Sequence, residues 1–292
     1  MNGYLLLILQ AVIFSFGGLM IKSVGTMFSP FLTSCLRFMI GIGILLAIQK
    51  IRDGHIHLTL LRKVIVIGGV CKAIHYLGEN FGVMRGFSYG GVLVWPVQTI
   101  VVFLISVFLY KERTTLRTAA GTLLCILGIG MISWNGAPLS VFLESGFVTM
   151  MAFILAGIGA AGFSLAQKKM VMNMELTEMN TSMFIFGWFT TLFVLVPTGP
   201  HMTGRASFPA IACILLLGGI TCIGFLLQGA ALKTVPILIA TIIQSSTVIL
   251  TILWGVLFYG DPLSTCIIVG TLLFLAGILA VNLKAPEKKT ES

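Results

Sequence analysis

Ten long apolar runs, separated by short breaks that carry charges, prolines or polar residues, dominate the sequence. Hydrophobic residues make up 58% of the chain and charged residues 9%, whereas soluble proteins carry about 25% charged residues. So few charges cannot cover a water-exposed surface, which excludes a soluble globular enzyme. Each run is close to the roughly 20 apolar residues that a helix needs to cross a bilayer. We therefore expect an all-α integral membrane protein with spans at 4–22, 30–49, 64–85, 88–110, 116–134, 146–167, 181–197, 208–231, 236–259 and 264–283.

The basic residues fall mainly on one side of this arrangement. With ten spans, the N-terminus and the even-numbered loops share a side that holds 13 basic residues: Lys50, Arg52, Arg62, Lys63, Lys111, Arg113, Arg117, Lys168, Lys169, Lys233, Lys284, Lys288 and Lys289. The other side holds three, Lys22, Arg85 and Arg205. Because basic loops stay in the cytoplasm, we expect both termini on the cytoplasmic side of the plasma membrane. The net charge of +9 then reflects these loops and not binding to nucleic acid.

The chain also contains an internal repeat. A shift of 149 residues places the Gly-Thr-Leu-Leu motif at 121–124 on the same motif at 270–273, Gly128-Ile129 on Gly277-Ile278, and Glu112 on Asp261. The repeat divides the chain into two five-span copies, 1–145 and 146–284, followed by a cytoplasmic tail at 285–292. Because five is odd, the copies must cross the membrane in opposite senses. Inverted repeats are typical of secondary transporters.

On these residues the sequence resembles the drug/metabolite transporter superfamily, EamA type, over essentially the whole chain. The resemblance is carried by Pro96, Glu112-Arg113, Gly121 and Gly128, by their counterparts Asp261-Pro262, Gly270 and Gly277, and by Arg37 in the second span. It implies a ten-helix carrier whose central cavity is lined by spans 1–4 and 6–9, with the fifth and tenth spans at the periphery. Ser245 stands where the second copy would have proline, and Asp261 where it would have glutamate. The family handles amino acids, organic cations, nucleotide sugars and lipid-linked sugars, so the resemblance leaves the cargo open.

The third span carries a polar stripe at helical spacing. Lys72, His75, Tyr76 and Glu79 occupy positions i, i+3, i+4 and i+7, which share one helix face. A charge near the bilayer centre costs about 2.5–3.5 kcal/mol or more, so such residues face protein or water and are candidates for substrate binding. Arg37 lies at a depth similar to that of Glu79, and the two side chains are within reach of each other. Two alternatives remain: a purely structural Arg37–Glu79 pair, or a Lys72 that extends along its stem to the cytoplasmic interface.

The repeat adds further candidates for the substrate site. The 149-residue shift places Glu79 on Gln228 and Trp95 on Gln244, and a two-fold axis would gather these four side chains at the centre. Gln98, Asn80 and Thr247 are additional polar candidates within the spans. Each glutamine has an alternative role in a hydrogen bond between helices, worth about 0.6–2 kcal/mol. We find no nucleotide-binding or metal-binding motif, and we expect no cofactor and no metal.

The favoured hypothesis is a secondary carrier, not an enzyme, that moves a small polar or amphiphilic metabolite by alternating access. Both signs of charge in the interior suit a zwitterion such as an amino acid, and an organic cation is the other option. A flippase for a lipid-linked sugar on the same fold is the alternative, and a membrane-embedded enzyme is the weaker one. The expected partners are the small-molecule substrate, membrane lipids, and protons or another coupling ion, with Glu79 and His75 as candidate titrating groups. A homodimer is left open.

Overall fold

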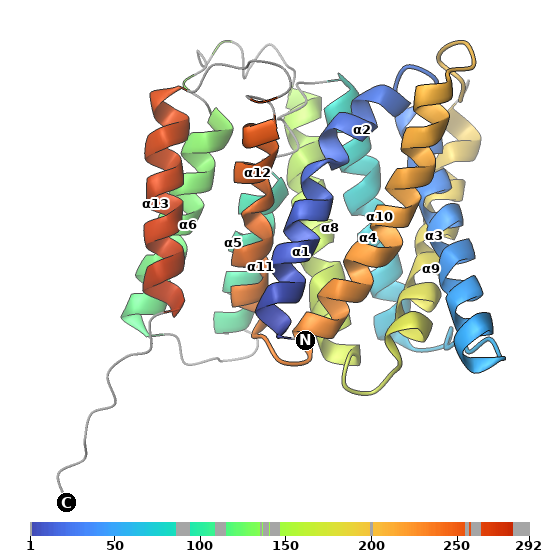
Figure 1. The fold of residues 1–292 in the computed structure, drawn as a ribbon, viewed down its shortest axis with the longest axis horizontal. Coiled ribbons are helices and arrows are strands. Elements are labelled where there is room, and N and C mark those ends of the chain that lie inside the picture. The colour runs from blue at the N-terminus through green and yellow to red at the C-terminus, as the bar shows by residue number, and fades with distance from the viewer. Residues whose placement is uncertain are drawn as a thin grey trace, which may run out of the picture.

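The computed structural model describes residues 2–85, 94–108, 115–134, 147–198, 201–254 and 264–282, with the single residues 136, 140 and 257. Its described residues are helical apart from loops and one isolated bridge between Phe28 and Met202. The α-helices lie side by side in one layered bundle (Figure 1). They are α1 (Gly3–Ser15), α2 (Gly17–Val24), α3 (Pro30–Asp53), α4 (Lys63–Arg85), α5 (Val94–Phe108), α6 (Leu116–Trp134), α8 (Phe147–Met170), α9 (Leu176–Leu195), α10 (Phe208–Leu232), α11 (Ile237–Ser245), α12 (Thr247–Trp254) and α13 (Thr265–Asn282).

Most of these helices are long and apolar enough to cross a membrane. Six segments of the described chain meet that standard: Gly3–Val24, Pro30–Asp53, Val148–Met170, Leu176–Thr198, Phe208–Leu232 and Ile237–Trp254. Three shorter apolar helices, Val94–Phe108, Leu116–Ile132 and Thr265–Val281, lie among them. The helix α4 is long enough, but Lys72, His75 and Glu79 make it more polar. The expected all-helical fold is confirmed for the described residues, and the count of ten spans stays a prediction.

Two helices begin at or directly after a proline. Pro30 is the first residue of α3, and the Ser29 hydroxyl accepts a hydrogen bond from the Leu32 amide at 3.2 Å. Pro236 directly precedes α11. Proline suits such positions because the first amides of a helix have no partner within the helix.

Two of the spans are interrupted within their length, at positions that the sequence analysis did not predict. The first span breaks at Phe16 between α1 and α2, and the ninth breaks at Ser246 between α11 and α12. Serine hydroxyls bond to backbone carbonyls at both places: Ser15 donates to Val12 at 2.6 Å, and Ser246 donates to Ile243 at 2.6 Å. Such bonds compete with the regular helical ladder and bend a helix.

Helices α6 and α13 pack against each other at one side of the bundle (Figure 1). A Cβ atom built on Gly128 would lie 2.6 Å from the carbonyl oxygen of Gly270, and one built on Gly270 would lie 2.6 Å from that of Gly128. Gly121 and Gly277 meet in the same reciprocal way, at 3.0 and 2.6 Å. Only glycine allows two backbones to approach so closely. Under the 149-residue shift these two contacts are copies of one another, as a local two-fold axis requires.

The other helix pairs repeat this reciprocity. Helix α4 packs on α8, and their counterparts in the repeat, α10 and α1, pack on each other. Helix α5 contacts α8, and their counterparts α11 and α1 contact each other. Helix α3 contacts α10, and their counterparts α9 and α4 contact each other. Residues far apart in sequence therefore meet in the middle of the bundle. Glu112, Arg113, Asp261 and the tail at 285–292, which the sequence analysis singled out, lie outside the described residues.

The glycine contact between α6 and α13 generates a prediction. Gly128→Ala should lower the melting temperature of the purified protein, because the added methyl group must push α13 away. The Gly270→Ala variant should lower it by a similar amount, because Gly270 is the other partner in the same backbone contact.

Gly130→Ala is the matched control on the same helix, since a Cβ at this residue meets nothing within 4 Å. It should be neutral or stabilising by up to about 1 kcal/mol, the helix-propensity gain of alanine over glycine. Equal melting temperatures for the Gly128→Ala and Gly130→Ala variants would contradict the contact.

Candidate functional site

The polar stripe of α4 faces the interior of the bundle. Lys72 is 0% exposed, Tyr76 1% and His75 5%, while the side chain of Glu79 keeps 19%. Close packing of α8 holds this stretch in place, because Gly159 leaves room for the backbone of α4. A Cβ at Gly159 would lie only 2.7 Å from the amide nitrogen of His75. The structure thus places the four side chains among protein atoms and not against lipid.

Arg37 of α3 and Glu79 form an ion pair at 3.0 Å between Nη1 and Oε2. The same Nη1 donates to Asn80 Oδ1 at 3.1 Å, and the guanidinium carbon lies 3.7 Å from the centre of the Tyr76 ring. The pairing expected from their depths is therefore present. It compensates a buried cation with an anion, a hydrogen bond and an aromatic face.

Thr221 of α10 links this cluster to the second half of the chain. Tyr76 donates its hydroxyl hydrogen to Thr221 Oγ1 at 3.0 Å, and Arg37 Nε donates to the same oxygen at 3.4 Å. The sequence analysis missed Thr221, because a threonine within an apolar run does not stand out. A local shift of α10 would change both hydrogen bonds.

Lys72 lies in an aromatic box. Its ammonium nitrogen is 3.6 Å from the ring centre of Phe225, 4.2 Å from that of Tyr76 and 4.9 Å from that of Phe163. Desolvated cation–π contacts contribute about 2 kcal/mol each, enough to offset part of the cost of burying the charge. Because Lys72 is fully buried, the alternative in which it extends to the interface is wrong.

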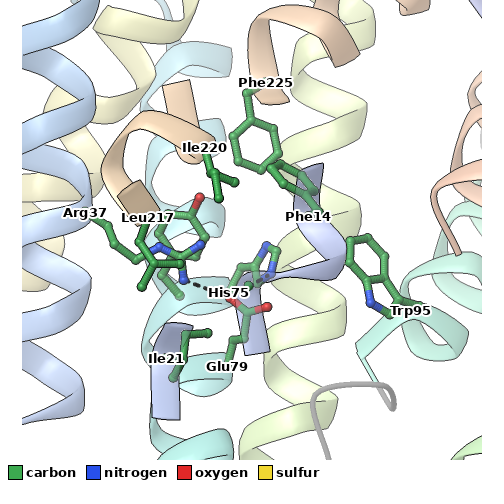
Figure 2. A pocket seen from close by; sticks show the side chains of 11 residues that line it. Phe14, Ile21, Arg37, His75, Glu79, Trp95, Leu217, Ile220 and Phe225 are labelled. Carbon is green, nitrogen blue, oxygen red and sulfur yellow. Dashed lines mark hydrogen bonds and ion pairs between the residues drawn. The ribbon is translucent and has the colours of Figure 1, made fainter. Parts of the chain in front are cut away.

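The charged cluster lines a pocket with an empty volume of about 380 Å³, part of it open to solvent. Figure 2 shows Arg37 on one side of this pocket, Trp95, Phe14 and Phe225 on the other, and His75 and Glu79 between them. Ile21, Leu217 and Ile220 supply apolar walls (Figure 2). The pocket thus offers one carboxylate and one guanidinium within an apolar and aromatic enclosure.

A second pocket, with an empty volume of about 210 Å³, adjoins the first. The two share Phe14, His75, Trp95 and Phe225. The second pocket is also lined by Lys72, Ala160, Phe163, Ser164 and three glutamines, Gln98, Gln228 and Gln244. We call it the amide pocket. All three glutamines named from the sequence therefore meet in one place, next to Trp95.

The glutamines form a connected network. Gln10 of α1 donates to Gln228 and accepts from Gln244, each at 3.0 Å. Gln228 and Gln98 both donate to Ser164 Oγ, at 2.9 and 3.1 Å. The sequence analysis missed Gln10 and Ser164. Ser164 had a usable signal, because the 149-residue shift places it on Ser15, the serine at the break of the first span.

Two of the predicted polar candidates lie outside both pockets. Asn80 donates to Ser34 Oγ at 2.8 Å and accepts from Arg37. Thr247 donates to the carbonyl of Ala11 at 3.4 Å. Both therefore hold helices together in this structure and do not line the cavity.

Comparison with known proteins places this arrangement in context. The model of the EamA-like transporter family matches residues 1–134 and 147–283. One solved crystal structure superposes with a TM-score of 0.76 at 16% sequence identity, covering 96% of this chain and 97% of the other. At that identity the likeness concerns the fold alone. The search of curated proteins found no match.

The Arg37–Glu79 pair generates a prediction about stability. Either Arg37→Met or Glu79→Gln should destabilise the protein by about 3–5 kcal/mol, because each leaves a poorly solvated partner without compensation. The double variant should lose less than the sum of the two, since it removes both charges together. Melting curves of the purified protein measure all three.

Arg52 and Glu175 supply a matched control pair. They form an ion pair at 3.2 Å, with side chains 48% and 65% exposed. Surface pairs of this kind contribute little, so Arg52→Met and Glu175→Gln should leave the melting temperature unchanged. Strictly additive losses at Arg37 and Glu79 would show that the two side chains are not coupled.

Proposed function

The chain belongs to the EamA-like transporter family of the drug/metabolite transporter superfamily, and from this premise we propose that it is a secondary carrier. Its cargo is a small polar or amphiphilic metabolite, an amino acid or an organic cation. The observation that carries the proposal is the pair of adjoining pockets in which ionised and amide side chains from both halves of the chain converge. A multi-pass membrane protein gains nothing from such costly groups in its interior unless they act on a polar solute.

We propose further that the fold consists of two inverted five-helix repeats, 1–145 and 146–284, with ten spans and both termini in the cytoplasm. The reciprocal contacts between α6 and α13 support the repeat, since a two-fold axis turns each contact into the other. The 13 basic residues on one side against three on the other support the orientation. The EamA-like match to each half of the chain agrees with this division.

In this proposal transport proceeds by alternating access. The pockets are enclosed by α1, α2, α3, α4 and α5 from the first repeat and by α8, α10 and α11 from the second. When the two repeats rock against each other around a central site, the site opens to each side of the membrane in turn. The breaks at Phe16 and Ser246 lie in helices next to the pockets and supply places where the helices bend.

Glu79 has the central role in cargo binding. It is the carboxylate that lines the larger pocket, and its Oε2 atom also lies 3.8 Å from His75 Nε2. A cationic group of the cargo competes with Arg37 for this carboxylate. Protonation of Glu79 would remove its negative charge, and protonation of His75 would add a further cation beside it. Either change would weaken binding of the cationic group, which would couple transport to protons.

The proposal predicts that Glu79→Gln lowers transport at least tenfold, because a neutral amide holds neither Arg37 nor a cationic cargo group. The measurement is counterflow in proteoliposomes with radiolabelled amino acids and organic cations. Glu175→Gln is the control, since this side chain is 65% exposed and lines neither pocket.

If the Glu79→Gln variant carried out counterflow at the wild-type rate, the proposed role of Glu79 would be wrong. Movement of a fluorescent lipid-linked sugar, with no counterflow of any water-soluble solute, would favour the flippase alternative. Absence of both activities would contradict the carrier proposal itself.

A further inference from the structure

The ammonium group of Lys72 has no acidic partner in the described part of the chain. The ion pairs found there join Arg37 to Glu79, His75 to Glu79, and Arg52 to Asp53 and Glu175. The carboxylate on the same helix face, Glu79, is bound to Arg37 at 3.0 Å. The cluster therefore sets the Arg37 guanidinium and the Lys72 amine against a single carboxylate. When Lys72 is protonated, no acidic group of the described residues is left to balance its charge.

His75 does not neutralise this charge. Its Nδ1 atom lies 3.0 Å from Lys72 Nζ. A charged lysine has donors only, so Nδ1 must be the acceptor and the ring of His75 is neutral with its proton on Nε2. That proton points toward Glu79, whose Oε2 is 3.8 Å away. The aromatic faces of Phe225, Tyr76 and Phe163 attract the cation but carry no net charge.

The pocket next to Lys72 offers further unused hydrogen-bonding groups. Gln98, 3% exposed, has an Oε1 atom with no partner among the described residues. Buried polar atoms of this kind are rare in native proteins and call for an explanation. Each glutamine of the network also has a second amide hydrogen besides the one that makes its hydrogen bond. The amide pocket thus presents the Lys72 amine, one free acceptor and several donors around a small space that is partly open to solvent.

We propose that the amide pocket binds the carboxylate of the cargo, with Lys72 as the group that recognises it. The carboxylate accepts hydrogen bonds from the Lys72 ammonium and from a glutamine amide, and a donor group of the cargo satisfies Gln98 Oε1. The cargo is therefore a carboxylate-bearing metabolite, and a simple organic cation is not transported. This inference rests on the proposed carrier function and narrows its substrate class.

The arrangement of the two pockets gives the rest of the cargo a place. Phe14, His75, Trp95 and Phe225 belong to both pockets, and Figure 2 shows Trp95, Phe14 and Phe225 on the side of the larger pocket away from Arg37. A cargo whose carboxylate lies at Lys72 extends past these residues toward Glu79. A cationic group at its other end would then face that carboxylate.

The test measures ligand binding to the purified full-length protein by isothermal titration calorimetry. The probes are L-amino acids, their carboxamides, the amines left after loss of the carboxylate, the matching 2-oxo acids, and inorganic phosphate. The key variant is Lys72→Met, which keeps the length of the side chain and removes its charge. Lys169→Met, at an exposed lysine of α8, is the matched control.

We expect binding of at least one carboxylate-bearing probe, with at least tenfold weaker binding of its carboxamide and amine. The Lys72→Met variant should lose at least tenfold in affinity for that probe, and Lys169→Met should bind as the wild type does. Without ligand, the Lys72→Met variant should melt at the wild-type temperature or above it, because an unpaired buried charge is replaced by an apolar group. A lower melting temperature would indicate a structural role for Lys72.

Other outcomes would overturn the inference. These are tighter binding of amines than of carboxylates, unchanged affinity in the Lys72→Met variant, or no binding by any anionic probe. If phosphate were the only probe that bound, the group recognised by the amide pocket would be a phosphate and not a carboxylate. Carriage of amines in the counterflow assay would leave the carrier function standing while this inference falls. If the Lys72→Met variant lost binding but the wild-type protein moved no solute, the carboxylate site would stand and the carrier function would fall.

Discussion

The cost of placing an ionised side chain inside a membrane constrains the rest of the structure. Arg37, Lys72 and Glu79 remain within the bundle because protein groups replace the water they lose. Arg37 and Glu79 neutralise each other, and three aromatic rings surround Lys72. These compensating groups come from α3, α4, α8 and α10, so the helices must pack in one arrangement for all of them to meet.

Close packing and cavity formation are linked in this bundle. Where glycines allow the helices to touch, as between α6 and α13, the backbone contact is tight and leaves no space for a solute. Where the larger polar and aromatic side chains stand between α1, α4, α8 and α10, two pockets remain. The repeat supplies different residues at equivalent places, Glu79 against Gln228 and Trp95 against Gln244. Residues that the 149-residue shift makes equivalent therefore contribute different chemistry to the site.

The sequence predicted the all-helical character of the described residues and the Arg37–Glu79 pair, because each depends on local pattern or on depth along a helix. It did not predict the breaks at Phe16 and Ser246, which depend on serine hydroxyls that also fit an unbroken helix. Nor did it identify Phe163, Phe225 or Thr221 as neighbours of the charges. An apolar residue facing a buried cation has the same sequence signature as one facing lipid, and only tertiary packing separates them.

Access to the central pocket from both sides of the membrane is the most direct test of the carrier mechanism. Gly17 lines the larger pocket, and a Cβ at this residue meets nothing within 4 Å, so Gly17→Cys introduces a thiol without a clash. In a background without the six native cysteines, a membrane-impermeant maleimide should label this thiol from either face, and more slowly when a transported solute is present. Labelling by a lipid-permeant maleimide alone, with the impermeant reagent unreactive from both faces, would contradict a water-filled site with alternating access.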